Sequence, residues 1–293
     1  MTAVAFIGLG NMGGGMAANL AAKGFAVRAF DLSAHALEKA VQAGCAAAAS
    51  AAEAVSGADV VVTMLPAGTH VAGVYRDALF GTVPTGTLLI DCSTIDVATA
   101  KALGAEAVEA GLVAVDAPVS GGIAAANAGT LTFMVGGTNE GFTRAKPVLE
   151  AMGKAVIHAG ASGAGQTAKI CNNMLLGASM IATAEAFVLA QKLGLDPQRF
   201  YDIASVSSGQ NWSMTSYCPL PDVGPESPAD RGYQGGFAVV LMLKDLRLAA
   251  EAAETAGSHT PMGEKALELY EALAAAGHGG LDFSAIIETL RGR

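Results

Sequence analysis

The stretch AVAFIGLGNMG, residues 3–13, decides the fold of this chain. An apolar, β-rich run ends at Gly8-Leu9-Gly10-Asn11-Met12-Gly13, a G-x-G-x-x-G pattern, and an alanine-rich helical stretch follows. In such a pattern the first glycine permits a tight turn, the second lets a pyrophosphate approach the backbone, and the third lets helix pack on strand. The stretch therefore predicts a strand, a turn and a helix that together receive a dinucleotide.

The choice of dinucleotide depends on Asp31, which ends the second predicted strand, residues 26–30. A carboxylate at that strand end accepts hydrogen bonds from ribose hydroxyls and repels a 2′-phosphate, so NAD is favoured over NADP. Arg28 precedes it, but strand alternation should point Arg28 away from the ribose. The alternative is a plain glycine-rich turn with an aspartate that caps the helix before Ser33.

Through the first half of the chain, short β-rich runs alternate with alanine-rich helical stretches. The predicted strands are residues 3–8, 26–30, 60–64, 88–91, 113–116, 131–135 and 155–158, and the predicted helices are 12–23, 34–43, 97–110 and 140–151. This alternation predicts an α/β fold, a doubly wound parallel sheet of the Rossmann type. Ligands gather beyond the carboxyl ends of such strands, so residues 64–66 and 91–94 should face the cofactor. An ordinary turn fits either loop equally well.

The second half is predicted to be all helical. Residues 163–193 form one long linking helix, and helices over 197–206, 238–256 and 261–275 follow. We therefore expect an NAD-binding domain over residues 1–162 and a helical substrate and oligomerisation domain over 163–293. Residues 207–237 are rich in Gly, Pro, Ser and Asp, but their aromatic side chains favour an ordered functional loop.

Composition excludes several function classes. The net charge is −9, which argues against a nucleic-acid partner. The four cysteines are scattered, so neither a disulfide framework nor a metal site is expected.

The N-terminus lacks a basic region before its first strand, and the longest apolar stretch, 174–184, is shorter than the ~20 residues of a membrane helix. We expect a cytoplasmic protein with no membrane partner. Only 15% of residues are charged, which suggests that some surface is buried between subunits.

Two polar clusters are candidates for the reacting site. Ser120 and the backbone N–H groups of Gly121 and Gly122 could hold a carboxylate, although a simple turn explains them as well. Lys169 lies on the long helix with Asn172 and Asn173 three and four residues later, on the same helix face. Alcohol oxidation needs a base for the hydroxyl proton, which Lys169 could supply. Taken alone, this cluster would be read as a surface lysine with a polar fringe.

A third cluster is the pair Lys244-Asp245, which interrupts the apolar stretch VVLMLKDLRLA, residues 239–249. Opposite charges in such a setting suggest a buried or cleft-facing pair. An exposed pair beside Arg247 fits the spacing nearly as well.

Four segments together resemble the β-hydroxyacid dehydrogenase family. They are FIGLGNMG at 6–13, DAPVSGG at 116–122, GAGQTAKICNN at 163–173 and KDLRLA at 244–249. The segments occur in the family's order, and the resemblance covers essentially the whole chain. It implies a Rossmann domain followed by a helical domain that pairs with its counterpart in a homodimer or homotetramer.

The resemblance also implies roles for individual residues. Lys169 matches the catalytic lysine, and Asn173 matches its amide partner. The predicted substrate contacts are Ser120, Gly121, Gly122, Asn172, Trp212, Phe237 and Asp245. The predicted cofactor contacts are Gly8, Leu9, Gly10, Asn11, Met12, Gly13, Asp31, Leu65, Pro66, His70, Thr94 and Lys244, with His70 where related enzymes often place Asn.

The long loop, residues 207–237, is similar to the insert of family members that act on 3-hydroxyisobutyrate. Trp212 and Phe237 would form an apolar wall for the C2 methyl group. This implies NAD-dependent oxidation of 3-hydroxyisobutyrate to methylmalonate semialdehyde, a step of valine catabolism. The alternatives are an NADPH-dependent reductase of a tartronate, succinic or malonic semialdehyde, and a non-catalytic dinucleotide-binding module. The second would typically lack Lys169 or Asn173.

Overall fold

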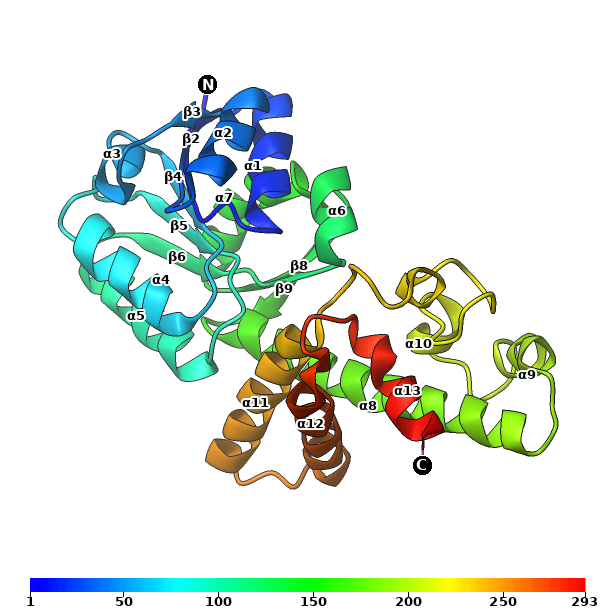
Figure 1. The fold of residues 1–293 in the computed structure, drawn as a ribbon. Coiled ribbons are helices and arrows are strands. Elements are labelled where there is room, and N and C mark those ends of the chain that lie inside the picture. The colour runs from blue at the N-terminus through cyan, green and yellow to red at the C-terminus, as the bar shows by residue number, and fades with distance from the viewer. Residues whose placement is uncertain (293) are drawn as a thin grey trace. The chain divides into compact units, whose positions relative to one another are not determined.

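The computed structural model describes residues 1–292, and the chain divides into two compact units, Met1–Lys169 and Ile170–Arg293. All the strands of the described residues lie in the first unit (Figure 1). They are β1 (Ala3–Ile7), β2 (Ala26–Phe30), β3 (Ala46–Ala47), β4 (Val60–Thr63), β5 (Leu88–Asp91), β6 (Val113–Asp116), β7 (Val119–Ser120), β8 (Leu131–Gly136) and β9 (Gly153–Gly160).

The first six strands lie in the order β3-β2-β1-β4-β5-β6 and are all parallel. This is the order of a dinucleotide-binding sheet, in which the direction of winding reverses between β1 and β4. Runs such as Val60–Thr63 and Leu88–Asp91 are buried along their whole length, as parallel strands covered on both faces must be. The Rossmann-type prediction is confirmed.

The prediction of parallel strands throughout is wrong at the far edge. β8 pairs antiparallel with β6 and β7, and β9 then pairs parallel with β8. The chain reverses because β6 runs through Pro118 directly into the short β7, and only residues 121–130, which include the seven-residue α6, separate β7 from β8. A parallel crossover needs a longer connection than this. The sheet is therefore mixed.

Helices cover both faces of the sheet. One face is covered by α1 (Gly13–Ala22), α2 (Ala34–Gln42), α6 (Gly122–Ala128) and α7 (Asn139–Glu150). The other is covered by α3 (Ala51–Val55), α4 (Gly68–Val74), a π-helical turn (Tyr75–Leu79) and α5 (Val97–Glu109). Side chains alternate along β1, so Val4 and Phe6 enter one core while Ala5 and Ile7 enter the other.

The second unit has its own helical core. Most of α8 (Ala164–Lys192) belongs to it, together with α9 (Pro197–Ala204), α10 (Trp212–Thr215), α11 (Val239–Ala256), α12 (Pro261–Leu273) and α13 (Ile286–Arg291). Short helical turns cover Pro228–Arg231, Ala274–His278 and Phe283–Ala285. The core is built around large buried side chains such as Phe187, Tyr270 and Phe283.

By length and composition, α8 is apolar enough to cross a membrane, with a mean hydropathy of 1.5 in its most apolar window. Half of that window is buried inside the structure. The buried core helix of a globular protein has the same length and composition.

Candidate active site

The turn between β1 and α1 has the geometry of a phosphate-binding loop. Gly8 has a φ of +96°, and a Cβ on it would overlap the carbonyl oxygen of Met64. A Cβ on Gly13 would overlap the carbonyl oxygen of Gly8. By contrast, a Cβ on Gly10 would meet nothing within 4 Å. The outer glycines serve the turn and the helix packing, and the open space beside Gly10 fits a pyrophosphate against the backbone.

Asp31 is held against this loop. Its Oδ2 accepts a hydrogen bond from the backbone N–H of Leu9 at 2.6 Å, and its Oδ1 accepts one from the N–H of Ser33 at 2.8 Å. Helix α2 is capped by Ser33 itself, whose side chain accepts from Ala36. The carboxylate is therefore not the cap of α2, and it stands beside the glycine loop as a ribose-binding residue should.

Arg28 points elsewhere, as strand alternation predicts. Its guanidinium donates to the carbonyl oxygens of Glu53 and Ser56 at 2.7 and 2.8 Å. The Arg28 guanidinium is therefore hydrogen-bonded at the end of α3. The charged side chain that contacts the glycine loop is that of Asp31.

A buried polar network joins the loops after β4 and β5. Asp91 Oδ1 accepts from the Thr63 hydroxyl at 2.8 Å and from the Ser93 N–H at 3.1 Å, and Ser93 Oγ accepts from the Leu65 N–H at 2.8 Å. The network fixes the loops in which the predicted cofactor contacts lie. Those contacts are the half-buried Leu65 and Thr94 and the exposed Pro66, followed on α4 by the exposed His70.

Burial makes Asp91 sensitive to pH. Desolvation raises the pKa of its carboxyl to about 6, against the lowering effect of the Ser93 and Thr63 hydrogen bonds. A carboxyl whose folded pKa lies above its unfolded value holds its proton more tightly in the folded state, so its contribution to stability falls as pH rises through that range.

We predict that Asp91→Asn removes this pH dependence. Between pH 4.5 and 7.5 the wild type should lose about 2 kcal/mol of unfolding free energy at this site, by the usual ~1.4 kcal/mol per pKa unit. Urea titrations of both proteins across this pH range measure the difference. A free-energy gap between variant and wild type that stays constant with pH would contradict the assignment.

The predicted substrate loop follows β6. Ser120 ends β7 half-buried, and Gly121 and Gly122 follow with φ values of +132° and +69°. A Cβ on Gly121 would lie 2.6 Å from the Cβ of Ala125. Only glycine fits this turn without strain, so the consecutive backbone N–H groups stay unshielded by side chains.

Lys169 lies on the second turn of α8, at the end of the first unit, and is 8% exposed. Fully buried lysines are rare in proteins. The interpretation of Lys169 as a surface lysine with a polar fringe is therefore wrong. Asn173 follows one helical turn later in the second unit and is buried as well.

Asn173 is oriented by a buried carboxylate. Its Nδ2 donates to Asp245 Oδ2 at 2.5 Å, and its Oδ1 accepts from the amide of the exposed Asn172 at 3.0 Å. Lys244 Nζ lies 3.4 Å from Asp245 Oδ1. Asp245 is 3% exposed, so Lys244-Asp245 is not an exposed pair beside Arg247. The structure gives Asp245 a supporting position, in which its carboxylate fixes the direction of the Asn173 amide.

The loop over residues 207–237 is ordered by Asp282. The rings of Trp212 and Tyr217 stack with centroids 4.9 Å apart, and the Tyr217 hydroxyl donates to Asp282 Oδ2 at 2.9 Å. The same oxygen accepts from the Phe237 N–H at 2.7 Å. One fully buried carboxylate therefore anchors both residues of the predicted apolar wall.

Sequence reasoning missed three buried polar residues, Asp116, Gln166 and Asp282. Each is a polar residue beside small or apolar neighbours, which is a usable but weak signal. Within residues 1–292, no group of three or more His, Cys, Asp or Glu side chains is placed to hold a metal ion. The cysteines are unbridged, and Cys171 is the exposed one among them.

Two family models match the chain. Residues 3–160 match the NAD-binding domain of 6-phosphogluconate dehydrogenase. Residues 163–290 match a domain described as the NAD-binding domain of NADP-dependent 3-hydroxyisobutyrate dehydrogenase. The two matches lie on either side of residues 161–162, and both models are described as NAD-binding, in agreement with NAD as the cofactor.

Relatives are similar over the full length. The chain is 52% identical to 3-hydroxyisobutyrate dehydrogenase of Pseudomonas aeruginosa, with 100% of both chains covered. It is 50% identical to an NAD-dependent L-serine dehydrogenase of the same organism, over 98% of this chain and 97% of that one. A solved structure of Mycobacterium tuberculosis 3-hydroxyisobutyrate dehydrogenase with L-serine has a TM-score of 0.95 at 49% identity, covering 99% of each chain. The chain therefore belongs to the 3-hydroxyisobutyrate dehydrogenase family of NAD-dependent oxidoreductases.

Proposed function

We propose that this enzyme oxidises 3-hydroxyisobutyrate to methylmalonate semialdehyde with NAD, as a step of valine catabolism. The observation that carries the proposal is the buried Lys169, followed one helical turn later by an Asn173 amide fixed by Asp245. A buried amine, followed one helical turn later by an oriented amide, suits proton transfer from an alcohol. A surface role explains neither the burial nor the hydrogen bond.

In the proposed mechanism, Ser120 and the N–H groups of Gly121 and Gly122 bind the substrate carboxylate. The neutral amine of Lys169 takes the proton of the C3 hydroxyl as the C3–H bond breaks with its electron pair. NAD supplies the hydride acceptor. The carbonyl of the aldehyde forms, and Lys169 then returns its proton to solvent. Asn173 holds the hydroxyl or the amine in line for this transfer.

The reaction is tested with 3-hydroxyisobutyrate that carries two deuterium atoms at C3. We expect one deuterium in the NADH formed and the other in the trapped aldehyde, both measured by mass spectrometry. Unlabelled NADH, or no aldehyde, would refute the proposed reaction.

A second candidate substrate is L-serine, because relatives of similar identity include an L-serine dehydrogenase. L-Serine and 3-hydroxyisobutyrate share the C3 hydroxyl and the carboxylate, and they differ at C2, where an ammonium replaces a methyl group. The choice therefore depends on what faces C2. Trp212 and Phe237 are apolar and favour the methyl group.

We predict that Trp212→Ala weakens this preference. Removing apolar contact to one methyl costs about 1–3 kcal/mol, so kcat/KM for 3-hydroxyisobutyrate relative to L-serine should fall about 10–200-fold. Tyr217→Phe, which keeps the ring stack and removes only the hydroxyl bonded to Asp282, serves as the matched control and should change the ratio less. An unchanged ratio in Trp212→Ala would show that Trp212 does not contact the C2 methyl group of the substrate.

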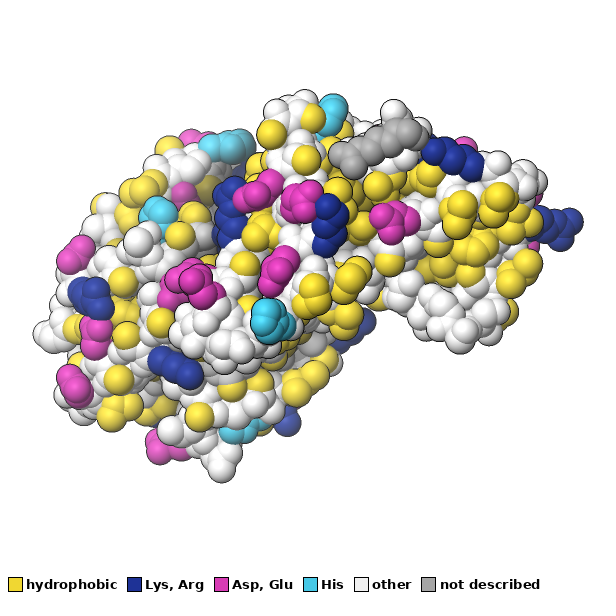
Figure 2. All heavy atoms as spheres, turned by 90° about the horizontal axis from the view of Figure 1, so that it is seen from below, with side chains coloured by type: hydrophobic (Ala, Val, Ile, Leu, Met, Phe, Trp, Pro, Cys, Tyr) yellow, Lys and Arg dark blue, Asp and Glu magenta, His cyan; other side chains and the backbone are white. Residues whose placement is uncertain are grey.

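We also propose that the enzyme is cytoplasmic and acts as a homodimer or homotetramer. Figure 2 shows hydrophobic side chains gathered at the surface, and the end of α8 with α9 exposes several of them. They are Leu189, Leu193, Leu195, Ile203 and Val206. Apolar surface of this kind marks an interaction site. Light scattering after size-exclusion chromatography measures the oligomeric state. A monomer at micromolar concentration would contradict the proposed homodimer or homotetramer.

We place the functional boundary between the NAD-binding part, residues 1–162, and the helical part, residues 163–293. The second family match begins at residue 163 and supports this choice. The compact units divide slightly later, after Lys169, and the first turn of α8 is hydrogen-bonded to Asp116 at the end of β6 in the first unit.

A further inference from the structure

The start of α8 has an unusual cap. The residues that precede and open the helix, Gly163, Ala164 and Gly165, have no side chain that can accept a hydrogen bond from its free N–H groups. A distant residue does so. Asp116, at the end of β6, accepts from the Gly163 N–H through Oδ1 at 2.7 Å and from the Gln166 N–H through Oδ2 at 2.9 Å. A carboxylate here satisfies these N–H groups and complements the helix dipole.

The same helical turn is also hydrogen-bonded to the loop that follows β5. Gln166 is fully buried, its Nε2 donates to the Ser93 carbonyl oxygen at 2.7 Å, and its Oε1 accepts from the Ile95 N–H at 3.1 Å. These two partners flank Thr94, a predicted cofactor contact. The turn that carries Gln166 is therefore bonded to the loop after β5 and to the end of β6.

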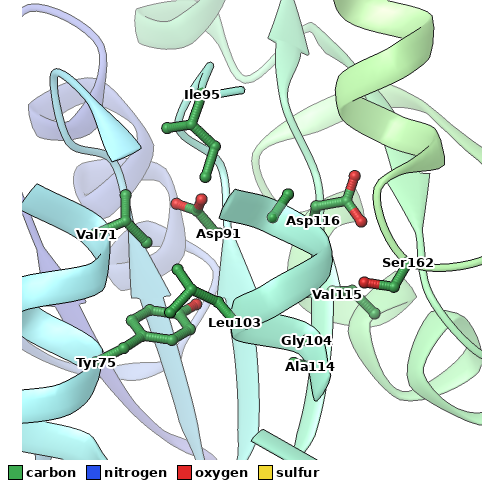
Figure 3. Close-up of a pocket in the computed structure, with 11 residues that line it drawn as sticks. Val71, Tyr75, Asp91, Ile95, Leu103, Gly104, Ala114, Val115, Asp116 and Ser162 are labelled. Atoms are coloured by element: carbon green, nitrogen blue, oxygen red, sulfur yellow. The ribbon is translucent and has the colours of Figure 1, made fainter. Parts of the chain in front are cut away.

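The fit around this turn leaves no room for adjustment. A Cβ on Gly165 would lie 2.8 Å from Asp116 Oδ2, and a Cβ on Gly136 would overlap Asp116 Oδ1. Asp91 and Asp116 are partners in the β5–β6 register, and they line one small cavity with Ser162 (Figure 3). In that view the Asp116 carboxylate points toward the segment of Ser162, away from Asp91.

We propose that Asp116 and Gln166 form a clasp that positions Lys169 against both the substrate loop and the cofactor loop. Ser120 lies four residues after Asp116, and Thr94 lies between the two partners of Gln166. Lys169 lies three residues after Gln166 on the same helix face. Both members of the clasp are positioning residues, and the inference rests on the proposed role of Lys169 as the proton acceptor.

The test is a double-mutant cycle on the full-length enzyme. Asp116→Asn keeps the shape and replaces one acceptor by a donor that faces a backbone N–H. We expect kcat to fall about 10–100-fold, since displacements near 1 Å cost rates of this order. The NAD dissociation constant should change less than about 2-fold, and the primary deuterium isotope effect on kcat should rise as hydride transfer becomes limiting.

In the Lys169→Ala background the same Asp116→Asn change should lower kcat less than about 3-fold, because residues that act through one another are not additive. An equal loss in both backgrounds would refute the clasp and leave the proposed function standing. Near-normal turnover of Lys169→Ala alone would refute the proposed function instead.

Two further variants guard against a folding defect. Asp196→Ala removes a carboxylate cap from the exposed start of α9, where Asp196 accepts from the Arg199 N–H. It should lower thermal stability but leave kcat and the isotope effect unchanged. Gln166→Met removes the bonds of Gln166 and fills the same space. If Asp116→Asn does not fold, the test is made with Gln166→Met. Its loss of kcat must then be smaller in the Lys169→Ala background than in the wild type, and an equal loss in both backgrounds would refute the clasp.

Discussion

Replacing Lys169 with alanine should lower kcat by about 10²–10⁴-fold, the usual contribution of a positioned general acid or base. The substrate hydroxyl would then have to lose its proton to water while hydride leaves C3. NAD binding should persist, because the glycine loop and Asp31 lie elsewhere in the unit. Stopped-flow measurement of NADH formation gives the rate, and fluorescence titration gives the NAD affinity.

Two variants sharpen this prediction. Lys169→Arg keeps a positive charge but cannot give up its proton in the working pH range, so it should be as slow as the alanine variant. Recovery of turnover in Lys169→Arg would show that the residue supplies charge and not a proton acceptor. Lys192→Ala, at the far end of the same helix, is the control and should keep normal kcat.

The second large effect concerns Asp31. Asp31→Ser should lower kcat/KM with NAD by about 10–100-fold, because hydrogen bonds to a charged group contribute about 1.5–3 kcal/mol each. It should also raise kcat/KM with NADP, because the 2′-phosphate is no longer repelled. The Leu9 N–H loses its acceptor at the same time, so part of the NAD loss reflects a looser glycine loop.

Glu38→Gln removes a nearby exposed acid on α2 and is the control for net charge. Its ratio of kcat/KM with NAD to kcat/KM with NADP should match that of the wild type. If this ratio shifts equally in Asp31→Ser and Glu38→Gln, general electrostatics, and not contact by Asp31, selects the cofactor.

Local patterns were sufficient for most of the first unit. The glycine motif, the buried apolar runs and the caps are all encoded within a few residues, so β2, β5 and β6 were predicted with their observed bounds. Short elements such as β3 and α3 were missed, because two to five residues carry no readable period. The reversal at β8 was missed because strand direction depends on pairing, which the sequence of one strand does not encode.

The supporting residues of the site could not be predicted for a related reason. Asp116 meets Gly163 and Gln166 across about 50 residues of chain, and Asp282 meets Tyr217 across 65. The sequence near Asp282 offers only the weak signal of a carboxylate between the apolar Leu281 and Phe283, which an ordinary turn aspartate can share. Lys169 could be singled out as a candidate, but its burial is a property of the folded chain.

We propose that the enzyme prefers a substrate with a C2 methyl group and uses NAD. The most direct measurement is kcat/KM for 3-hydroxyisobutyrate, L-serine and 3-hydroxypropionate, and for tartronate semialdehyde in the reverse direction, each with the NAD and the NADP couple. We predict the highest value for 3-hydroxyisobutyrate with NAD, about 10-fold or more above 3-hydroxypropionate, which lacks the methyl group. A higher value for L-serine, or for semialdehyde reduction with NADPH, would contradict the account.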